Sequence, residues 1–323
     1  MHLTVTKKPF FGLLAVFILG LPAFGQPVLW QNPAEIGSRD LFYGLGGQGH
    51  QPQGPVTFLE EDLAGTNPKF DVRDKNGVKW KVKLGLEARP ETVASRITWA
   101  VGYYVDDEYF MQDLQVEGLP AHLHRGQSLI AAGGFVHNVR LKRHAKDEKK
   151  IGDWKWRKDP FSGTRELNGL RVLMAVLDNW DLKDENNHIY KDDSRDIYMV
   201  SDLGASFGSA GRSFPPAGAK GNVASYSHAK FIRKVTPSTV SFATPAWPSV
   251  IYIFTPKEFI SRVRLAWIGK DIPRDDARWM GKLLAGLSPG QIHDAFRAAG
   301  YTPAEVDAFS AVLARRITLL TDL

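Results

Sequence analysis

Cysteine is absent from the 323 residues of this sequence. Disulfide bonds, thiolate catalysis, cysteine-ligated zinc and iron–sulfur clusters are therefore excluded. A chain of this length can instead hold its fold by packing alone, and its 43% apolar residues suit a globular protein. A strong charge bias is also absent, since 41 basic and 35 acidic residues give a net charge of only +6. That excess does not indicate a nucleic-acid partner.

Long apolar runs are absent except near the N-terminus. There, Lys7 and Lys8 precede the apolar residues 10–21, and Ala-Phe-Gly follows at residues 23–25. This pattern is typical of a cleaved signal peptide, and the run is shorter than the roughly 20 residues of a membrane-spanning helix. We therefore predict that residues 1–25 are a signal peptide and that the mature protein is exported, periplasmic or extracellular, without stable membrane insertion. Cleavage removes two of the 41 basic residues, leaving 39 against 35 acidic ones, a net charge of +4.

Alternating apolar and polar residues predict a group of strands in the first half of the chain. Residues 26–55 are rich in Gly, Pro and Gln, and we predict a loosely ordered lead-in there. The first three strands are expected at 56–60, 69–73 and 78–84, with Asn-Gly, a strong hairpin signal, between the last two. A helix follows from Pro90, a residue that suits a first helical turn. The remaining predicted elements are strands at 109–116, 135–141 and 197–200 and helices at 167–177, 256–267, 275–287, 289–299 and 303–319.

A highly charged segment, residues 142–160, separates the strand-rich half from the mainly helical half. We predict an α+β fold with a small antiparallel sheet and one helix in residues 56–145, and a mainly helical part in residues 146–323. Residues 204–222, dominated by Gly, Ser, Ala and Pro, are expected to form a long flexible loop, and loops of that length inside a compact domain are usually functional or disordered.

The segment with the clearest chemical meaning is Trp-Asp-Leu-Lys-Asp-Glu-Asn, which starts at Trp180. It places Asp181 five residues before Asn186, the spacing of the catalytic loop of protein kinases. In phosphoryl transfer, the Asp orients the attacking hydroxyl and accepts its proton, and the Asn amide oxygen holds a metal ion. Asp202, in Asp-Leu-Gly, follows a predicted strand 21 residues after Asp181 and would bind magnesium directly. Either motif alone is also compatible with an ordinary loop or turn.

Two lysines near the end of the third strand are candidates for binding phosphate. Lys83 is the first choice, and Lys81, on the same face of the strand, is the alternative. Glu91, in the first turn of the predicted helix, would hold the lysine by an ion pair, with Glu87 as the alternative. Charged pairs between a strand and a helix are also common as purely structural contacts.

The turn between the first two strands contains a Gly-x-x-x-Lys pattern from Gly65 to Lys69. The backbone N–H groups of Gly65, Thr66 and Asn67 could cradle phosphate oxygens. An ordinary Gly-Asn hairpin turn is the alternative explanation of the same residues. The predicted nucleotide-binding residues are Gly65, Thr66, Asn67, Lys69, Lys81 and Lys83.

Taken in order, these elements over residues 56–210 resemble an atypical protein kinase, and the Gly-x-x-x-Lys turn resembles that of HipA-type and phosphatidylinositol-kinase-like proteins. The resemblance implies a two-lobed fold, ATP and Mg²⁺ as cofactors, and phosphoryl transfer to a hydroxyl of a protein or small molecule. Asp181, Lys83 and Glu91 would be catalytic, and Asn186 and Asp202 would bind the metal. The chain departs from standard kinases, because Asn-Trp replaces His-Arg before Asp181, the glycine loop is reduced and no Ala-Pro-Glu follows. The alternative function is that of an exported pseudokinase, a non-catalytic module that binds a nucleotide or another ligand.

Other motifs carry weaker signals. His122 and His124 could hold a metal ion, but the helical spacing of a His-Glu-x-x-His zinc site is lacking. In residues 154–158, Trp alternates with Lys and Arg, a pattern that could stack on bases or sugars. We favour an amphipathic strand in which the Trp rings pack inward and the charges face solvent.

Overall fold

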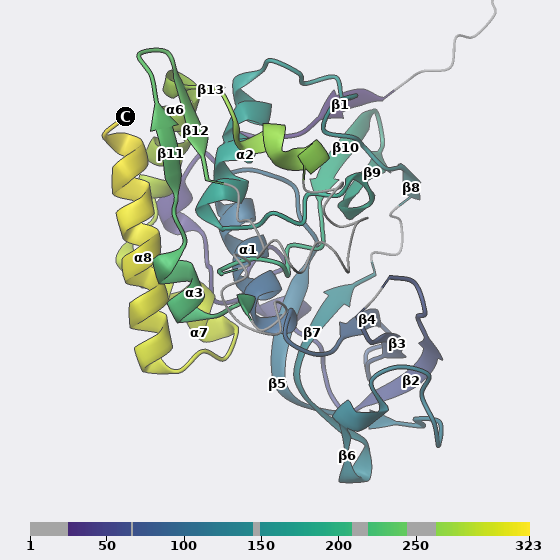
Figure 1. Ribbon diagram of the computed structural model, residues 1–323. Coiled ribbons are helices and arrows are strands. Elements are labelled where there is room, and N and C mark those ends of the chain that lie inside the picture. Colours follow the sequence, from purple (N-terminus) through teal and green to yellow (C-terminus); the bar gives the residue numbers. More distant parts are fainter. Residues whose placement is uncertain (1–24, 66, 145–148, 209–218, 244–262) are drawn as a thin grey trace, which may run out of the picture.

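The computed structural model describes residues 25–65, 67–144, 149–208, 219–243 and 263–323. Within these residues the fold is α+β, as predicted. Figure 1 shows the sheet that contains β2 to β7 at one end of the molecule and the long helices at the other. None of the described helices is long and apolar enough to cross a membrane. The predicted signal peptide, apart from Gly25, and the predicted lobe boundary at 145/146 lie outside the described residues.

Six strands form one sheet that closes on itself. Its order is β4-β3-β2-β5-β7-β6, and β4 also pairs with β7, so five of the strands make a ring. The pairings are antiparallel, as predicted, except for the short parallel contact between β2 and β5 that completes the ring. The strands are Val56–Glu61 (β2), Lys69–Arg73 (β3), Lys79–Lys83 (β4), Glu108–Glu117 (β5), Ile130–Ala131 (β6) and Phe135–Arg143 (β7).

The alternation in β4 explains how a lysine becomes buried. Trp80 and Val82 belong to the smaller apolar core, which the sheet encloses. The lysines of Lys-Trp-Lys-Val-Lys lie on the opposite face of the strand. Lys81 is half-buried there, whereas Lys83 is only 5% exposed because the start of α1 lies against it.

The helix α1 (Ala88–Ala100) is buried on nearly all sides. It packs against β5 and β7 of the sheet and against α7 of the helical part. Val93 and Ile97 belong to the larger apolar core, while Glu91 and Arg96 are buried polar residues of the same helix. Charged side chains on a fully buried helix are tolerated only when they are paired. The position of Glu91 therefore requires cations close by.

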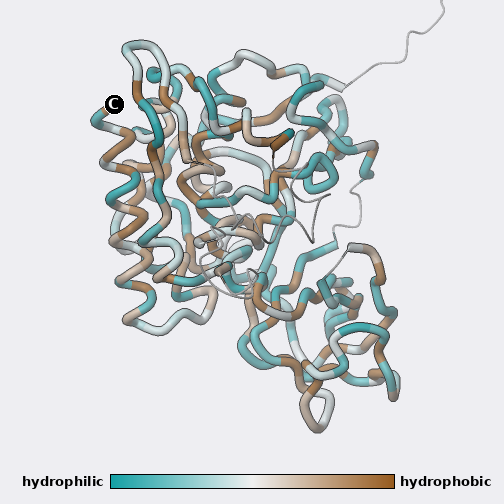
Figure 2. The backbone as a smooth tube through the Cα atoms, viewed as in Figure 1, coloured by the Kyte–Doolittle hydropathy of each residue, from teal (hydrophilic) through white to brown (hydrophobic). Residues whose placement is uncertain are grey.

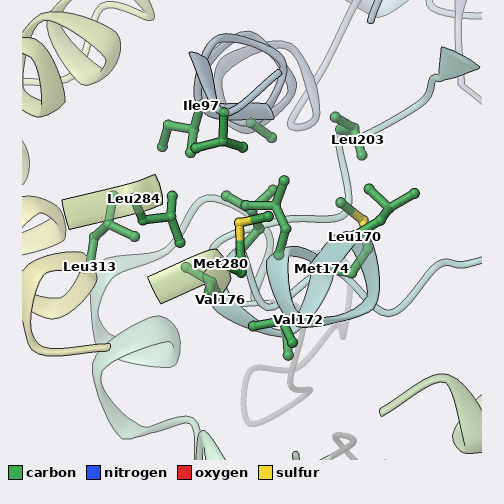
Figure 3. Close-up of a cluster of buried hydrophobic side chains, with 14 of the residues drawn as sticks. Ile97, Leu170, Val172, Met174, Val176, Leu203, Met280, Leu284 and Leu313 are labelled. Atoms are coloured by element: carbon green, nitrogen blue, oxygen red, sulfur yellow. The ribbon is translucent and has the colours of Figure 1, made fainter. Parts of the chain in front are cut away.

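The larger apolar core lies where α1 meets the long helices, and Figure 3 shows Ile97, Met174 and Met280 converging there. Leu203 of the Asp-Leu-Gly segment is 2% exposed and joins the same core beside α2. Packing thus anchors the residue that follows Asp202. The long helices are Arg165–Val176 (α2), Arg274–Ala285 (α6), Pro289–Ala298 (α7) and Pro303–Thr321 (α8).

The predictions for the last three helices are confirmed by α6, α7 and α8. Both α7 and α8 begin with Pro in the first turn and a capping box, built on Ser288 and on Thr302. In Figure 2, apolar and hydrophilic residues alternate along α8, as expected of a helix with one face on the core. The helix predicted at 256–267 falls mostly outside the described residues, and Ala266–Gly269 form a 3-10 helix, η7.

Two small sheets lie outside the closed sheet, one in the order β1-β10-β9-β8 and the other β11-β12-β13. All of their strands except β1 come from the half predicted to be mainly helical. Strand β1 belongs to residues 26–55, which pack more closely than the prediction of a loose lead-in implies. Leu29 and Leu41 from that segment are buried in the larger core, although they follow no helical or strand period. The strands are Gln26–Val28 (β1), Lys149–Gly152 (β8), Asn187–Asp192 (β9), Arg195–Val200 (β10), Ile232–Val235 (β11), Thr239–Phe242 (β12) and Ile272–Pro273 (β13), and a short helix, Val223–His228 (α3), precedes β11.

Candidate active site

One buried ammonium group gathers carboxylates from separate parts of the chain. The Nζ of Lys83, at the end of β4, lies 2.9 Å from Glu91 Oε2 of α1 and 3.1 Å from Glu87 Oε2. The same Nζ forms an ion pair with Asp202 Oδ1, just after β10. Oxygen atoms of these three carboxylates lie within 4.8 Å of one another. The structure therefore brings Lys83, Glu91 and Asp202 into a single cluster.

The charges in this cluster stabilise one another. Burial alone would lower the pKa of Lys83, but Glu91 and Asp202 outweigh it and hold the pKa above its ordinary value. Burial would likewise raise the pKa of Asp202, but Lys83 outweighs it, and the pKa falls to about 2. Both groups are therefore charged at neutral pH, and each charge is retained inside the protein because it is paired.

The second lysine on this face of β4 has different partners. Lys81 forms ion pairs with Asp62 and, at 3.5 Å, with Asp71. The Nζ of Lys69 also lies 3.5 Å from Asp62 Oδ2. Of the lysines predicted to bind a nucleotide, Lys83 is the one in the three-carboxylate cluster, and Lys69 and Lys81 pair with aspartates outside it.

Both candidate glutamates contact the lysine, but their surroundings differ. Glu91 is fully buried, and its Oε1 accepts a hydrogen bond from Arg140 Nη2 at 2.7 Å. Glu87 accepts a hydrogen bond from Asn67 Nδ2 at 2.6 Å and forms an ion pair with Lys220. Two buried cations thus hold Glu91, with Lys83 at one carboxylate oxygen and Arg140 at the other. Glu87 instead links the cluster to the β2–β3 turn and to the chain beyond the Asp-Leu-Gly segment.

The β2–β3 turn, predicted to cradle phosphate, touches the cluster through Asn67. Gly65 adopts a φ of 67°, a conformation that favours glycine. Its carbonyl oxygen accepts a hydrogen bond from Arg125 Nη1 at 2.5 Å. The turn is thus held on both sides, by Arg125 and by Glu87. Thr66 lies outside the described residues.

A β-hairpin brings the two sequence motifs together. Strands β9 and β10 pair antiparallel along their length, and Ser201 N donates a hydrogen bond to Asn186 O at 3.0 Å. Asn186 therefore lies beside the residue that precedes Asp202. The side-chain Nδ2 of Asn186 donates to the carbonyl oxygen of Asp181 at 2.8 Å, which closes the Asp-x4-Asn loop. Within the described part of the chain, no hydrogen bond is directed at the amide oxygen of Asn186.

The carboxylates of Asp181 and Asp202 are both partly exposed to solvent. The Asp181 side chain is 33% exposed, and its Oδ1 lies 3.0 Å from Lys183 Nζ. The Asp202 side chain is 45% exposed, and this residue adopts a φ of 52°. Left-handed backbone at a non-glycine residue is uncommon and clusters at functional sites. Asp181 and Asp202 can therefore be reached by a ligand, whereas Glu91 lies behind them.

Sequence reasoning missed the buried polar residues behind the cluster. Arg140 on β7 contacts Glu91, and its Nε lies 3.4 Å from Glu108 Oε1. Burial raises the pKa of Glu108 to about 8, although the charge of Arg140 opposes this rise. The available signal was an arginine between Val139 and Leu141, since a charge inside an apolar strand is expected to be buried and paired.

The sequence analysis also missed a second group of buried polar residues, which holds Ser201, the residue before Asp202, in place. Ser201 Oγ donates a hydrogen bond to Asp106 Oδ2 at 2.5 Å, and Lys142 Nζ lies 2.8 Å from Asp106 Oδ1. These contacts tie the end of β10 to the closed sheet. Asp202 is therefore positioned from one side by Ser201 and from the other by the buried Leu203.

Residues 204–208 read Gly-Ala-Ser-Phe-Gly and match the nucleophile-elbow pattern of serine hydrolases. The structure does not support that chemistry. Ser206 is fully buried, and its Oγ donates to the carbonyl oxygen of Leu203 at 2.7 Å. A nucleophilic serine needs an accessible hydroxyl beside a base. Phe207 is buried as well, so this segment serves packing.

The donor atoms suit a divalent cation that prefers oxygen. Glu87 and Glu91 are buried and face the lysine, whereas Asp202 is open to solvent. Carboxylate and amide oxygens are the hard ligands that Mg²⁺ prefers. Asp202 and Asn186 are therefore the residues that would hold a metal, while the two glutamates neutralise Lys83.

No model of a known protein family and no curated protein matches this sequence. Among solved structures, the chain is similar to the proinflammatory kinase CtkA of Helicobacter pylori, with 12% identity and a TM-score of 0.45 over 84% of this chain and 98% of that one. It is also similar to the Golgi casein kinase with Mn and ADP bound, with 10% identity and a TM-score of 0.40 over 84% and 73% of the two chains. A second structure of the Golgi casein kinase gives 9% identity and a TM-score of 0.37, over 84% of this chain and 72% of that one. Likeness at this level does not transfer an activity, so a function has to be argued from the site itself.

Proposed function

We propose that this protein is an atypical kinase that transfers a phosphoryl group from ATP, with Mg²⁺, to a hydroxyl of a protein or small molecule. The observation that carries the proposal is the position of Lys83, held between Glu91 of α1 and Asp202 after β10. A strand lysine, a helix glutamate and an aspartate after a hairpin are the phosphate- and metal-binding groups that phosphoryl transfer uses. In this proposal residues 56–145 and 146–323 form two lobes, with the nucleotide bound between them.

Each residue has a distinct role in the proposal. Lys83 would bind phosphate oxygens, and Asn186 and Asp202 would hold a metal ion, which would supply positive charge to offset that of the phosphates. Asp181 orients the acceptor hydroxyl. The hydroxyl oxygen forms a bond to the terminal phosphorus as the bond to the leaving ADP breaks, and the hydroxyl proton passes to the Asp181 carboxylate. The backbone of the β2–β3 turn, as in HipA-type proteins, lies against the phosphates.

Lys83 pairs with buried carboxylates and with an exposed one, and this difference would allow a ligand to enter the site. Asp202 is open to solvent and can turn to a metal, whereas Glu91 is buried and held by Arg140. Lys83 therefore keeps Glu87 and Glu91 as partners when Asp202 is engaged elsewhere. A lysine that is fixed before the ligand arrives loses little conformational entropy on binding.

Replacing Lys83 by methionine should abolish the rise in unfolding midpoint that Mg–ATP produces. Binding to the native protein stabilises it by about 2.7 kcal/mol at a ligand concentration of 100 Kd. A thermal-shift titration of the parent protein, Lys83→Met and Asp202→Asn measures this rise for each protein against its own midpoint without ligand. The matched control is Lys81→Met on the same strand face, which should keep the full shift because Lys81 pairs with Asp62. An equal shift in Lys83→Met and in the parent would exclude this nucleotide site.

We also propose that the protein is exported, on the basis of Lys7, Lys8 and the apolar residues that follow. Cleavage after Gly25 would leave β1, which begins at Gln26, intact. The mature protein should therefore begin with Gln26 or its cyclised form, and intact-mass spectrometry of protein recovered from the producing cells measures this. A cytosolic chain that still begins at Met1 would contradict the proposal.

A further inference from the structure

A cavity of about 500 Å³ lies beside the proposed catalytic loop. Its lining contains five basic residues, which we call the basic pocket: Lys155, Arg157, Lys158, Lys183 and Arg264. Two acidic residues line it as well, so the formal charge of the lining is five minus two, or +3. The volume falls in the usual range of small-molecule sites, roughly 300–1,000 Å³. The pocket is therefore large enough for a small anionic ligand.

Two acidic residues against five basic ones leave the lining with an excess of positive charge. Asp184 Oδ1 accepts a hydrogen bond from the backbone N–H of Trp156 at 3.2 Å and so holds the chain in place. Lys155, Lys158 and Arg264 form no ion pair with another described residue. Arg157 forms none either, so four of the five cations have no acidic partner in the part of the chain that the structure describes, and an anionic ligand would supply one.

Three of the basic residues of the pocket, Lys155, Arg157 and Lys158, lie on one tight turn. Trp154 and Trp156 are each 2% exposed, which confirms that the rings of this run pack inward. The run is a tight turn instead of the predicted strand, because Lys158 N donates to Lys155 O at 3.0 Å. The guanidinium of Arg157 lies over the ring of Trp267, 4.5 Å from its centroid. Buried tryptophans therefore hold the backbone that carries these three cations.

The basic pocket is directly connected to the proposed general base. Lys183 belongs both to the pocket lining and to the Asp-x4-Asn loop. Its Nζ lies 3.0 Å from Asp181 Oδ1, the atom that would accept the hydroxyl proton. An anionic group bound in the pocket would thus be held a short distance from the reacting hydroxyl. Fixing one end of an acceptor in this way orients its other end for reaction.

We propose that the basic pocket binds an anionic group of the phosphoryl acceptor, and that the acceptor is a small hydroxyl-bearing molecule with a phosphate or carboxylate substituent. This inference rests on the proposed kinase function and assigns its substrate class. The phosphate and carboxylate forms share one chemistry, a compact anion that accepts charge-assisted hydrogen bonds from lysine and arginine.

Inorganic pyrophosphate without metal is the probe, and isothermal titration calorimetry measures its binding to the full chain. In the double variant Lys155→Gln/Lys158→Gln the dissociation constant should rise by about tenfold or more, the usual size for the loss of charge-assisted hydrogen bonds. Lys234→Gln, an exposed lysine on β11, is the matched control and should bind like the parent.

Each other outcome overturns the inference. Equal affinity in the double variant and the parent, or no binding by the parent, removes the pocket as an anion site. Loss of binding in Lys83→Met alone assigns the probe to the nucleotide site. Citrate in a parallel titration distinguishes a carboxylate from a phosphate preference, and a hexaglutamate peptide that binds where both small anions fail would refute a small-molecule acceptor.

The Mg–ATP thermal shift separates this inference from the function on which it rests. The double variant should keep that shift, since neither lysine contacts the cluster around Lys83. Pyrophosphate binding without any Mg–ATP shift would leave an anion site on a protein that is not a kinase. A normal shift without pyrophosphate binding would leave the kinase and remove the substrate assignment.

Discussion

Replacing Asp181 by asparagine should slow the release of ADP from ATP by about a hundredfold or more, because a positioned general base typically contributes at least that much. Asparagine keeps the size of the side chain but cannot take up the hydroxyl proton. The backbone carbonyl that accepts from Asn186 is unchanged, so the loop should keep its conformation. The readout is slow hydrolysis of ATP with Mg²⁺, in which water takes the place of the acceptor hydroxyl, followed as ADP formed over time.

The matched control for this substitution is Asp193→Asn, in the turn between β9 and β10. Asp193 is exposed and has a φ of 46°, a left-handed backbone that asparagine also tolerates. It should release ADP at the parental rate, while Asp181→Asn should keep the Mg–ATP thermal shift. Equal rates in Asp181→Asn and the parent would remove Asp181 from the mechanism. A thermal shift in a parent protein that forms no ADP would favour the pseudokinase alternative.

The elements that position the site could be predicted from local patterns. The alternation in β4 placed Lys83 at the end of a strand, and helical spacing after Pro90 placed Glu91 in a first turn. Of the hairpin between Asn186 and Asp202, the second strand alone was predicted, at 197–200. Each of these predictions depends on neighbours within a few residues, and that is the range over which sequence periodicity carries information.

The choice between paired alternatives could not be made from the sequence. Lys81 and Lys83 share a strand face, so their periodicity is identical. The difference lies in what covers each one: Asp62 pairs with Lys81, and α1 covers Lys83. Glu87 and Glu91 were predicted as alternative partners of the lysine, but both contact the ammonium group of Lys83. Such distinctions depend on contacts between elements far apart in the chain.

The basic pocket could not be foreseen for the same reason. Its lysines and arginines come from a turn near residue 155, from the Asp-x4-Asn loop and from Arg264. Alternation in residues 154–158 indicates that the Trp rings face inward, but it does not say what the charged side opposes. The strands β8, β9 and β1 were missed as well, because β1 has three residues and the sequences of β8 and β9 contain too few apolar residues to show an alternation.

Replacing Arg140 by methionine should lower the free energy of unfolding by about 3–5 kcal/mol, the usual cost of removing one partner from a buried ion pair. Arg140 is 4% exposed and lies between two buried carboxylates, Glu91 at 2.7 Å and Glu108 at 3.4 Å. Without the guanidinium, the buried Glu91 loses its hydrogen-bonded cation on one oxygen and keeps Lys83 on the other. Urea unfolding at neutral pH measures the change, and a parental free energy in Arg140→Met would show that the pairing is energetically neutral.

Two further variants test whether the loss comes from unpaired charge or from lost packing. Adding Glu91→Gln to Arg140→Met removes the buried carboxylate that the guanidinium neutralised, so the double variant should regain part of the stability. Methionine fills much of the volume of arginine, so a packing defect would persist unchanged in the double variant. Arg143→Met, at the end of the same strand, is the matched control, since Arg143 is half-exposed and contacts His50 at the surface. Its free energy of unfolding should stay within about 0.5 kcal/mol of the parent, as for most surface substitutions.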